Sequence, residues 1–185
     1  MKINKVDTEL SVSPQIAASD IAEIARAGFK TIVCNRPDGE GNDQPLFHEI
    51  EETAKKAGLE CHYLPVESGK VMDEDAEAFG KLIDGAPKPV FAYCRTGTRS
   101  ITLWSLSRAG KVDLPEILAK SKQAGYDMSG VVRRVANKGK TPSGAVDGKF
   151  DVVIVGAGAA GISVASSILS RAPDIDVAIV DPADI

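Results

Sequence analysis

Short hydrophobic runs alternate with amphipathic segments along the first two thirds of the chain, and glycine, proline or asparagine marks most of the boundaries. The runs predict strands and the amphipathic segments predict helices. Ser19 is expected to cap the first helix and Gly28 to end it. The predicted strands are residues 6–12, 30–34, 60–64 and 89–93, and the predicted helices are residues 19–27, 45–57, 73–83, 100–109, 115–124 and 129–136. This alternation is typical of an α/β fold, a parallel sheet flanked by helices.

The periodicity is lost in NKGKTPSGAVDGK, whose glycine, lysine, proline and serine content is typical of a linker. We therefore expect a first domain over residues 1–136, a linker over 137–149 and a second unit over 150–185. The second unit reads as strand, glycine-rich turn, helix and strand, the start of a Rossmann-type βαβ fold. Because two parallel strands cannot bury both faces of a sheet, we expect a piece of a longer fusion protein whose last segment is loosely held.

Composition narrows the functional classes. The 185 residues are 43% hydrophobic and 26% charged, as in a soluble globular protein. The net charge of -4 is spread along the chain, which argues against nucleic acid or an anionic membrane as a partner. No apolar run reaches the roughly 18 to 20 residues of a membrane span, and no signal peptide is evident, so the cytoplasm is expected. The three cysteines lack CxxC spacing, which argues against a metal site or a redox pair.

The stretch CRTGTRS, residues 94–100, carries the main candidate chemistry. A loop that joins a strand to a helix lies where α/β sheets bind ligands, and its backbone N–H groups favour an anion. An arginine holds two anion oxygens, and the same positive field favours a cysteine thiolate. The glycine gives the anion room, and the serine caps the helix or donates to the thiolate. The predicted catalytic residues are Cys94, Arg99 and Ser100, and the predicted anion-binding residues are Arg95, Thr96, Gly97 and Thr98.

The loop resembles two known types of anion loop. Protein tyrosine phosphatases place five residues between the cysteine and the arginine, whereas rhodanese-type sulfurtransferases place four, often as CRxGxR. Four residues separate Cys94 from Arg99, which resembles the rhodanese loop. In the purely structural alternative, Cys94 is a buried apolar thiol and the arginines form surface ion pairs. For Cys34 and Cys61 we keep the interpretation as buried apolar thiols.

Four stretches carry a wider resemblance over about residues 3–135: TELSVSPQI, AGFKTIVCNRPDGE, PVESG and AYCRTGTRS. Together they are similar to the bacterial family named beta-lactamase hydrolase-like protein, phosphatase-like domain. The resemblance implies the fold of dual-specificity phosphatases. Since the family is also filed with sulfurtransferases, the resemblance leaves the reaction open.

Chemistry suggests an order among the alternatives. A phosphatase must expel a basic oxygen, which calls for a general acid and a loop wide enough for three phosphoryl oxygens. The candidate acids are Asp38, Glu67 and Asp73, with Asp75 nearby, and turn or helix-cap roles suit them as well. We therefore predict sulfur transfer through a persulfide on Cys94, with a small anion such as thiosulfate or a persulfide as substrate. The alternatives are a phosphatase acting on phosphate esters through a phosphocysteine, and a non-catalytic anion-binding module.

The sequence GAGAAG follows a hydrophobic strand and opens a helix, which is the context of a dinucleotide-binding turn. The predicted cofactor-binding residues are Gly156, Gly158, Gly161 and Asp181. The segment resembles the start of flavoprotein disulfide-reductase-type enzymes, with sulfide:quinone oxidoreductases as the nearest type. This resemblance implies FAD, or NAD(P), for a full-length oxidoreductase fusion. We do not expect the short segment to bind it well, and we expect no cofactor for residues 1–136.

Overall fold

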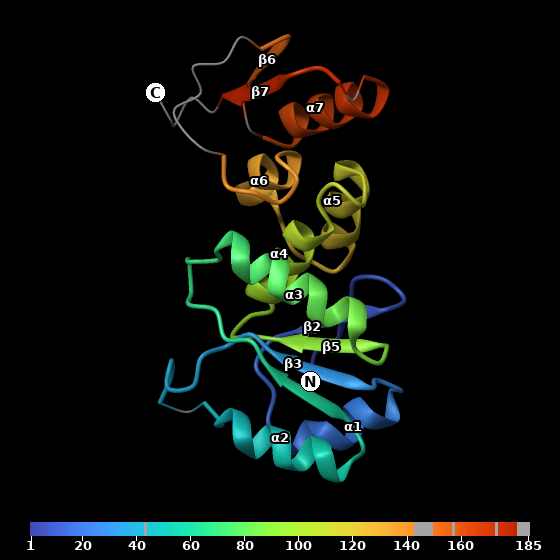
Figure 1. The fold of residues 1–185 in the computed structure, drawn as a ribbon, viewed down its shortest axis with the longest axis vertical. Helices are drawn as coiled ribbons and strands as arrows, with labels where there is room; N and C mark the ends of the chain where they lie inside the picture. Colours follow the sequence, from blue (N-terminus) through green and yellow to red (C-terminus); the bar gives the residue numbers. More distant parts are fainter. Residues whose placement is uncertain (43, 143–149, 157, 173, 181–185) are drawn as a thin grey trace.

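The structure, a computed structural model, describes residues 1–42, 44–142, 150–156, 158–172 and 174–180. A five-stranded sheet lies between two layers of helices, and a separate two-stranded sheet follows (Figure 1). The strands are β1 (Asn4–Lys5), β2 (Leu10–Ser13), β3 (Thr31–Cys34), β4 (Glu60–Tyr63), β5 (Val90–Tyr93), β6 (Val152–Val155) and β7 (Val177–Val180). The helices are α1 (Ile21–Arg26), α2 (Phe47–Lys56), α3 (Asp73–Gly85), α4 (Thr98–Arg108), α5 (Leu114–Gln123), α6 (Val132–Ala136) and α7 (Ala159–Arg171).

The main sheet has the order β1-β2-β5-β3-β4 and is mixed. The four strands β2, β5, β3 and β4 pair in parallel as predicted, but β1 runs antiparallel to β2. The single strand expected over residues 6–12 is therefore wrong. Asp7 Oδ1 accepts the backbone N–H groups of Glu9 and Leu10, each at 2.8 Å, and these bonds turn the chain into a hairpin.

The parallel strands end in register at one edge of the sheet. Ser13 and Cys34 both pair with Tyr93, and Cys34 also pairs with Tyr63. The carboxyl ends of β2, β5, β3 and β4 therefore lie side by side, and the segments that leave them gather above this edge. In parallel sheets this edge is where ligands bind.

Each face of the sheet has its own hydrophobic cluster. On one face α1 and α2 bury side chains such as Ile24 and Ile50 against β3 and β5. On the other face α3, α4 and α5 pack together, and α4 is buried along most of its length between its neighbours. α3 approaches α4 closely at Gly80, where a Cβ would lie 2.9 Å from the Cβ of Ser107. The helix that follows Cys94 is thus the central helix of the larger core.

Apart from residues 6–12, the predicted helices and strands of the first domain are confirmed, with shifted ends. α1 is preceded by a 3₁₀ turn, Ala18–Asp20, so Ser19 does not cap it. Asp20 stands at the N-cap position of α1 without a side-chain cap bond; its Oδ2 instead accepts the N–H of Ala17 at 2.8 Å and closes the 3₁₀ turn. Gly28, with φ +91°, ends the helix as predicted. α4 begins two residues earlier than predicted, at Thr98.

The chain after α6 contacts the first domain before the second unit begins. Of the expected linker, the structure describes residues 137–142, and here Thr141 bonds to Asp73 at the start of α3. β6 and β7 pair in parallel with α7 between them, as predicted, and α7 contacts α5. Among the described helices, none combines the length and hydropathy that crossing a membrane requires.

Candidate active site

Cys94 is the first residue after β5, and the loop behind it curls round its sulfur. The side chain is buried, and Sγ accepts the backbone N–H of Gly97 at 3.1 Å. Gly97 is the N-cap of α4 and has φ 89°, a left-handed conformation that glycine adopts without strain. The N-terminus of a central helix and a cysteine sulfur are therefore directed at the same point, where a bound anion is favoured.

Arg99 lies in the first turn of α4 and is held from two other segments. It is only 7% exposed. Its Nη1 donates to the carbonyl of Val66 at 2.7 Å, and its Nη2 donates to Glu40 Oε2 at 2.7 Å. The same Glu40 oxygen accepts Nε of Arg36 at 2.7 Å. The Arg99 bond is the main cause that holds the pKa of Glu40 below its ordinary value. The guanidinium is thus fixed in place with donors to spare for a ligand.

Ser100 has a partner other than the sulfur. Its hydroxyl donates to Asn35 Oδ1 at 2.9 Å. Asn35 is fully buried and is itself tied to β5 and β4, through its N–H to the Tyr93 carbonyl and its Nδ2 to the Leu64 carbonyl. In this arrangement Ser100 anchors α4 to the end of β3, and it takes neither of the two predicted roles, capping the helix or donating to the thiolate.

A cavity of about 440 Å³ opens beside the loop. It is lined by Ser68, Gly69, Val71, Arg95, Thr96, Thr98, Arg99, Thr102, Val131 and Arg134. The Arg95 side chain is exposed, and in the described part of the chain it has no hydrogen-bond or ion-pair partner. Thr96 and Thr98 join their hydroxyls at 3.0 Å. Four of the seven predicted loop residues, Arg95, Thr96, Thr98 and Arg99, therefore line one cavity.

A larger cavity, about 610 Å³, lies between α5 and α7 and includes Tyr126 and Met128. It contains none of the residues from 94 to 100. We place the candidate chemistry at the smaller cavity because its lining includes the buried Arg99 and Arg95, the residue that directly follows Cys94.

The predicted acids differ in how firmly they are held. Asp73 accepts Nη2 of Arg134 at 2.6 Å and the N–H of Thr141 at 2.9 Å, and the Thr141 N–H is the main cause that lowers the pKa of Asp73. Asp38 Oδ1 accepts the first N–H of α2, from Phe47, at 2.8 Å. Both carboxylates are therefore engaged as acceptors within the fold.

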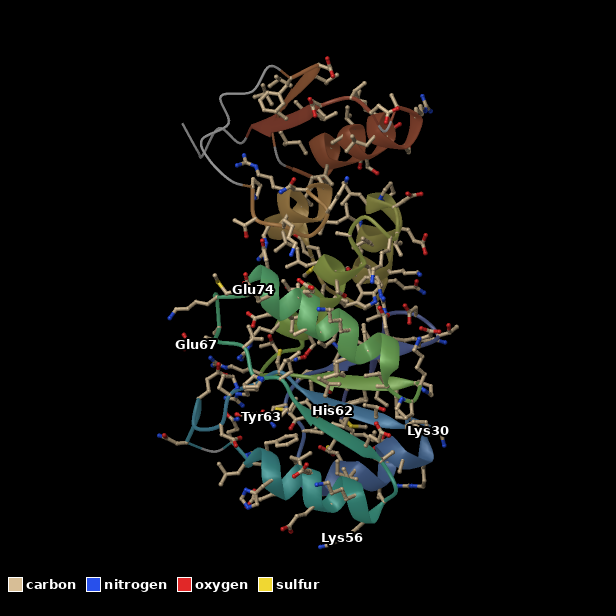
Figure 2. All side chains as sticks on the ribbon, viewed as in Figure 1. Lys30, Lys56, His62, Tyr63, Glu67 and Glu74 are labelled. Carbon is tan, nitrogen blue, oxygen red and sulfur yellow. The ribbon has the colours of Figure 1, made fainter. Side chains whose placement is uncertain are left out.

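Of the three predicted acids, Glu67 has the weakest contacts with the rest of the fold. It is exposed on the loop between β4 and α3 (Figure 2), and its pKa is lowered by an exposed ion pair with Lys70. The next two residues in the chain, Ser68 and Gly69, line the cavity. A single exposed ion pair contributes little and exchanges readily with water, so Glu67 is the predicted acid best able to reach a ligand.

The other two cysteines remain ordinary thiols. Burial raises the pKa of Cys34 to about 11 and that of Cys61 to about 12. Within the described residues, no cluster of three or more His, Cys, Asp or Glu side chains could hold a metal ion.

The glycine-rich turn of the second unit has part of the predicted geometry. Gly156 has φ 106°, and a Cβ on Gly161 would lie 1.9 Å from the Gly156 carbonyl oxygen, so helix and strand approach closely there. Gly158 is the N-cap of α7. Asp181 lies outside the described residues. The assignment of a nucleotide to this turn stays a prediction.

Three contributors to the site were not predicted from the sequence: Glu40, Asn35 and Tyr126. Glu40 lies in the same NRPDGE stretch as Asp38, the residue that the sequence predicts as an acid. Tyr126, after α5, places its hydroxyl 3.1 Å from the Thr96 carbonyl oxygen. The only sequence feature that could have indicated Glu40 is its position in a loop at the sheet edge where Arg99 is expected. The sequence around Tyr126 contains no feature that indicates a role at the site.

Comparison with known proteins identifies the first domain. Residues 2–111 match the family model described as beta-lactamase hydrolase-like protein, phosphatase-like domain. A beta-lactamase hydrolase-like protein of Agrobacterium fabrum is 32% identical over 135 residues, which are 72% of this chain and 31% of that protein. The chain thus spans about a third of the length of this curated relative.

Solved structures agree with the family match. A candidate phosphatase from Neisseria meningitidis Z2491 is 40% identical and has a TM-score of 0.68, over 75% of this chain and 99% of that one. TpbA of P. aeruginosa, solved in complex with pTyr, is 16% identical with a TM-score of 0.54, over 76% of this chain and 84% of that one. At this identity the TpbA likeness concerns the fold alone.

The prediction of sulfur transfer is wrong. The family and the solved structures that match this chain are phosphatase-like, which favours the alternative given above. The prediction relied on the four-residue spacing between Cys94 and Arg99. The structure shows why that spacing does not discriminate: the short loop still directs an N–H at the sulfur and keeps the arginine in the first helical turn. The family match ends before the second unit, so the predicted oxidoreductase fusion has no support from it.

Proposed function

Because this chain belongs to the family of beta-lactamase hydrolase-like proteins, phosphatase-like domain, we propose that it is a cysteine-dependent phosphatase of phosphomonoesters. One observation carries the proposal. The Cys94 sulfur accepts the Gly97 N–H at the start of α4, with Arg99 buried one turn away and a cavity of about 440 Å³ alongside. This is a nucleophile inside an anion-binding loop, next to space for an ester group.

In the first step the Cys94 thiolate attacks phosphorus. The sulfur–phosphorus bond forms as the bond from phosphorus to the ester oxygen breaks, giving a phosphocysteine. Backbone N–H groups of the loop and the free donors of Arg99 bind the three non-bridging oxygens. Since Glu40 and the Val66 carbonyl hold the guanidinium in place, little reorganisation is needed as charge develops on these oxygens.

The leaving alkoxide or phenoxide needs a proton, and Glu67 is the proposed donor. It must be protonated at that moment, so a bound phosphate ester has to displace the Lys70 ion pair and disfavour the carboxylate. In the second step water attacks phosphorus, Glu67 accepts the water proton, and the sulfur–phosphorus bond breaks. Inorganic phosphate leaves and the Cys94 thiolate returns.

The cavity fits a small anionic substrate. Its walls combine hydroxyl groups with the apolar side chain of Val131, and the exposed Arg95 adds positive charge at the rim. TpbA, which shares the fold, was solved with phosphotyrosine. An aryl phosphate is therefore the first substrate class to test.

The test is phosphate release from two esters, p-nitrophenyl phosphate and phenyl phosphate, by the wild type, Cys94→Ser and Glu67→Gln. We expect Cys94→Ser to be inactive on both esters because the nucleophile is lost. Glu67→Gln should lose about tenfold or more on phenyl phosphate and little on the nitrophenyl ester, whose leaving group needs no proton. Trapped protein from a rapid quench should carry one phosphate on Cys94, detected by mass.

Two results would reject the proposal. Equal phosphate release by the wild type and Cys94→Ser would remove the nucleophile from the mechanism. No release by the wild type, together with phosphate binding that Cys94→Ser retains, would make the domain a non-catalytic anion-binding module. An unchanged leaving-group dependence in Glu67→Gln would reject Glu67 alone and leave the nucleophile in place.

A further inference from the structure

One peptide unit of the loop is held on both sides. The carbonyl oxygen of Thr96 accepts the hydroxyl of Tyr126 at 3.1 Å, and the N–H of Gly97 donates to Cys94 Sγ at 3.1 Å. These two groups belong to the same peptide. Because a trans peptide is planar, its C=O and N–H point in opposite directions. Holding the oxygen toward the phenol therefore directs the N–H toward the sulfur.

The Tyr126 hydroxyl has a defined direction. Asn4 of β1 donates Nδ2 to the Tyr126 oxygen at 2.7 Å. Since a phenol has a single proton and Asn4 supplies a donor, that proton is left for the Thr96 carbonyl. Burial raises the pKa of Tyr126, so the phenol keeps its proton at working pH.

The same phenol closes off the space that the loop would need to rearrange. A Cβ built on Gly97 would lie 2.0 Å from the Tyr126 oxygen. If the Thr96–Gly97 peptide turned over, its carbonyl oxygen would lose the phenol hydrogen bond and would face the thiolate. The second contact is electrostatically unfavourable, so the observed orientation is favoured.

We propose that Tyr126 is a positioning residue that keeps the Gly97 N–H directed at the Cys94 sulfur and so stabilises the thiolate. Tyr126 lies after residue 111, where the family match ends, and it reaches the loop from the segment that follows α5. The inference rests on the proposed function only in taking Cys94 as the reactive thiol. Its effect on the sulfur can be measured without any phosphate ester.

Other groups near the sulfur keep one charge state over the relevant range. Cys94 interacts electrostatically with Cys34 on β3 and with Tyr126. Burial raises the pKa of Cys34 to about 11, so it stays neutral below that pH. Arg95 on the loop and Arg99 on α4 are permanent cations. A shift in the titration of Cys94 on removing the Tyr126 hydroxyl is then attributable to the loop peptide.

The experiment measures the rate of Cys94 alkylation by iodoacetamide from pH 4 to pH 9 in the full chain, followed by peptide mass spectrometry. Tyr126→Phe keeps the ring and removes the hydrogen bond. Its alkylation midpoint should move to higher pH by roughly half a unit to one unit, which matches a three- to tenfold loss of thiolate stabilisation. The kcat on p-nitrophenyl phosphate should fall by a similar factor, about three- to tenfold.

Two further variants separate positioning from simple destabilisation. Asn4→Ala removes the donor that orients the phenol, and it should shift the midpoint in the same direction by less. Ser105→Ala removes a buried hydroxyl of α4 that donates to the Ile101 carbonyl and lies 3.2 Å from the Ser121 hydroxyl of α5. It should leave the midpoint unchanged because Tyr126 keeps its own hydroxyl. A thermal unfolding measurement on each variant checks that it is folded.

An unchanged midpoint in folded Tyr126→Phe overturns the inference, and so does an equal shift in Ser105→Ala. If the wild type hydrolyses no phosphate ester while the Tyr126→Phe midpoint still shifts, the proposed function fails and this inference stands. If Tyr126→Phe does not fold, Asn4→Ala decides: a shift to higher pH supports the inference and no shift overturns it.

Discussion

Gly97 is constrained twice, by its backbone angle and by its neighbour. Its φ of 89° is left-handed, and Tyr126 fills the position of a Cβ. Gly28 has a similar φ of 91°, but nothing lies within 4 Å of its Cβ position. The pair therefore separates the cost of backbone strain from the cost of displacing the phenol.

We expect Gly28→Ala to lower the free energy of unfolding by about 1–2 kcal/mol, from strain alone, with unchanged activity. Gly97→Ala should cost about 2–4 kcal/mol and reduce phosphatase activity about 100-fold, because the loop must move away from the phenol. Urea unfolding and initial rates on an aryl phosphate measure both effects. Equal activity in the two variants would show that the loop tolerates displacement.

At the scale of single residues, the sequence predicted the loop of residues 94–100 but not the distant residues that hold it in place. Cys94, Gly97 and Arg99 are neighbours in the chain, so their spacing already indicates an anion site. Glu40 is 59 residues from Arg99, and Tyr126 is 30 residues from Thr96. Such contacts exist only once β3, β5 and α5 are packed. A lone carboxylate or tyrosine in a loop is uninformative before that packing is known.

Among the elements, the segment between β3 and α2 does more than connect them. Through Glu40 it joins Arg99 on α4 to Arg36 at the end of β3, and Arg36 also donates to Gln15 after β2. Two strand ends and a helix are thus linked through one carboxylate. We expect this link to matter both for stability and for binding the phosphoryl group.

Glu40→Gln tests that link. The variant should raise KM for an aryl phosphate about tenfold, because the Arg99 guanidinium loses its charged partner. The pKa of Glu40 is lowered in the folded state, so its stabilising effect is present above the ordinary value of 4.5 and is lost as pH falls through the lowered pKa. The unfolding temperature of the wild type should therefore drop more steeply below about pH 4 than that of Glu40→Gln.

The control is Glu51→Gln, which removes a carboxylate paired with Lys55 on the exposed side of α2. This variant should show the same dependence of unfolding temperature on pH as the wild type, and the same KM. If the unfolding temperatures of Glu40→Gln and the wild type depend on pH in the same way, the Glu40 carboxylate does not contribute to the pH dependence of stability.

Elements were predicted well where hydrophobic periodicity alone decides them, as in β3, β5 and α3. They were predicted poorly where side chains bond to the backbone. Asp7 turns a predicted strand into a hairpin, and Asp20 closes the 3₁₀ turn that precedes α1. Both effects come from a carboxylate that accepts a backbone N–H, and hydrophobicity does not register such bonds.

For the whole molecule, the extent of the first domain depends on residues just after α6. Thr141 donates its N–H and its hydroxyl to Asp73, and a Cβ on Gly139 would lie 2.3 Å from the Leu106 carbonyl oxygen. These contacts tie the segment 137–142 to α3 and α4. The loss of hydrophobic periodicity placed the end of the domain at residue 136, but polar and glycine-rich sequence can also pack when its backbone groups find partners.

We therefore propose that the domain extends to residue 142, and two truncations test this. A chain of residues 1–142 should fold and keep the aryl phosphatase activity of the full chain, whereas residues 1–136 should unfold at a lower temperature because Asp73 loses Thr141. Since the Thr141 N–H is the main cause that lowers the pKa of Asp73, the stabilisation is present above the ordinary value of 3.8 and is lost as the pH falls through the lowered pKa. The two unfolding temperatures should thus converge as the pH falls below about 4. Identical stability of the two chains at pH 7 would place the end of the domain at α6.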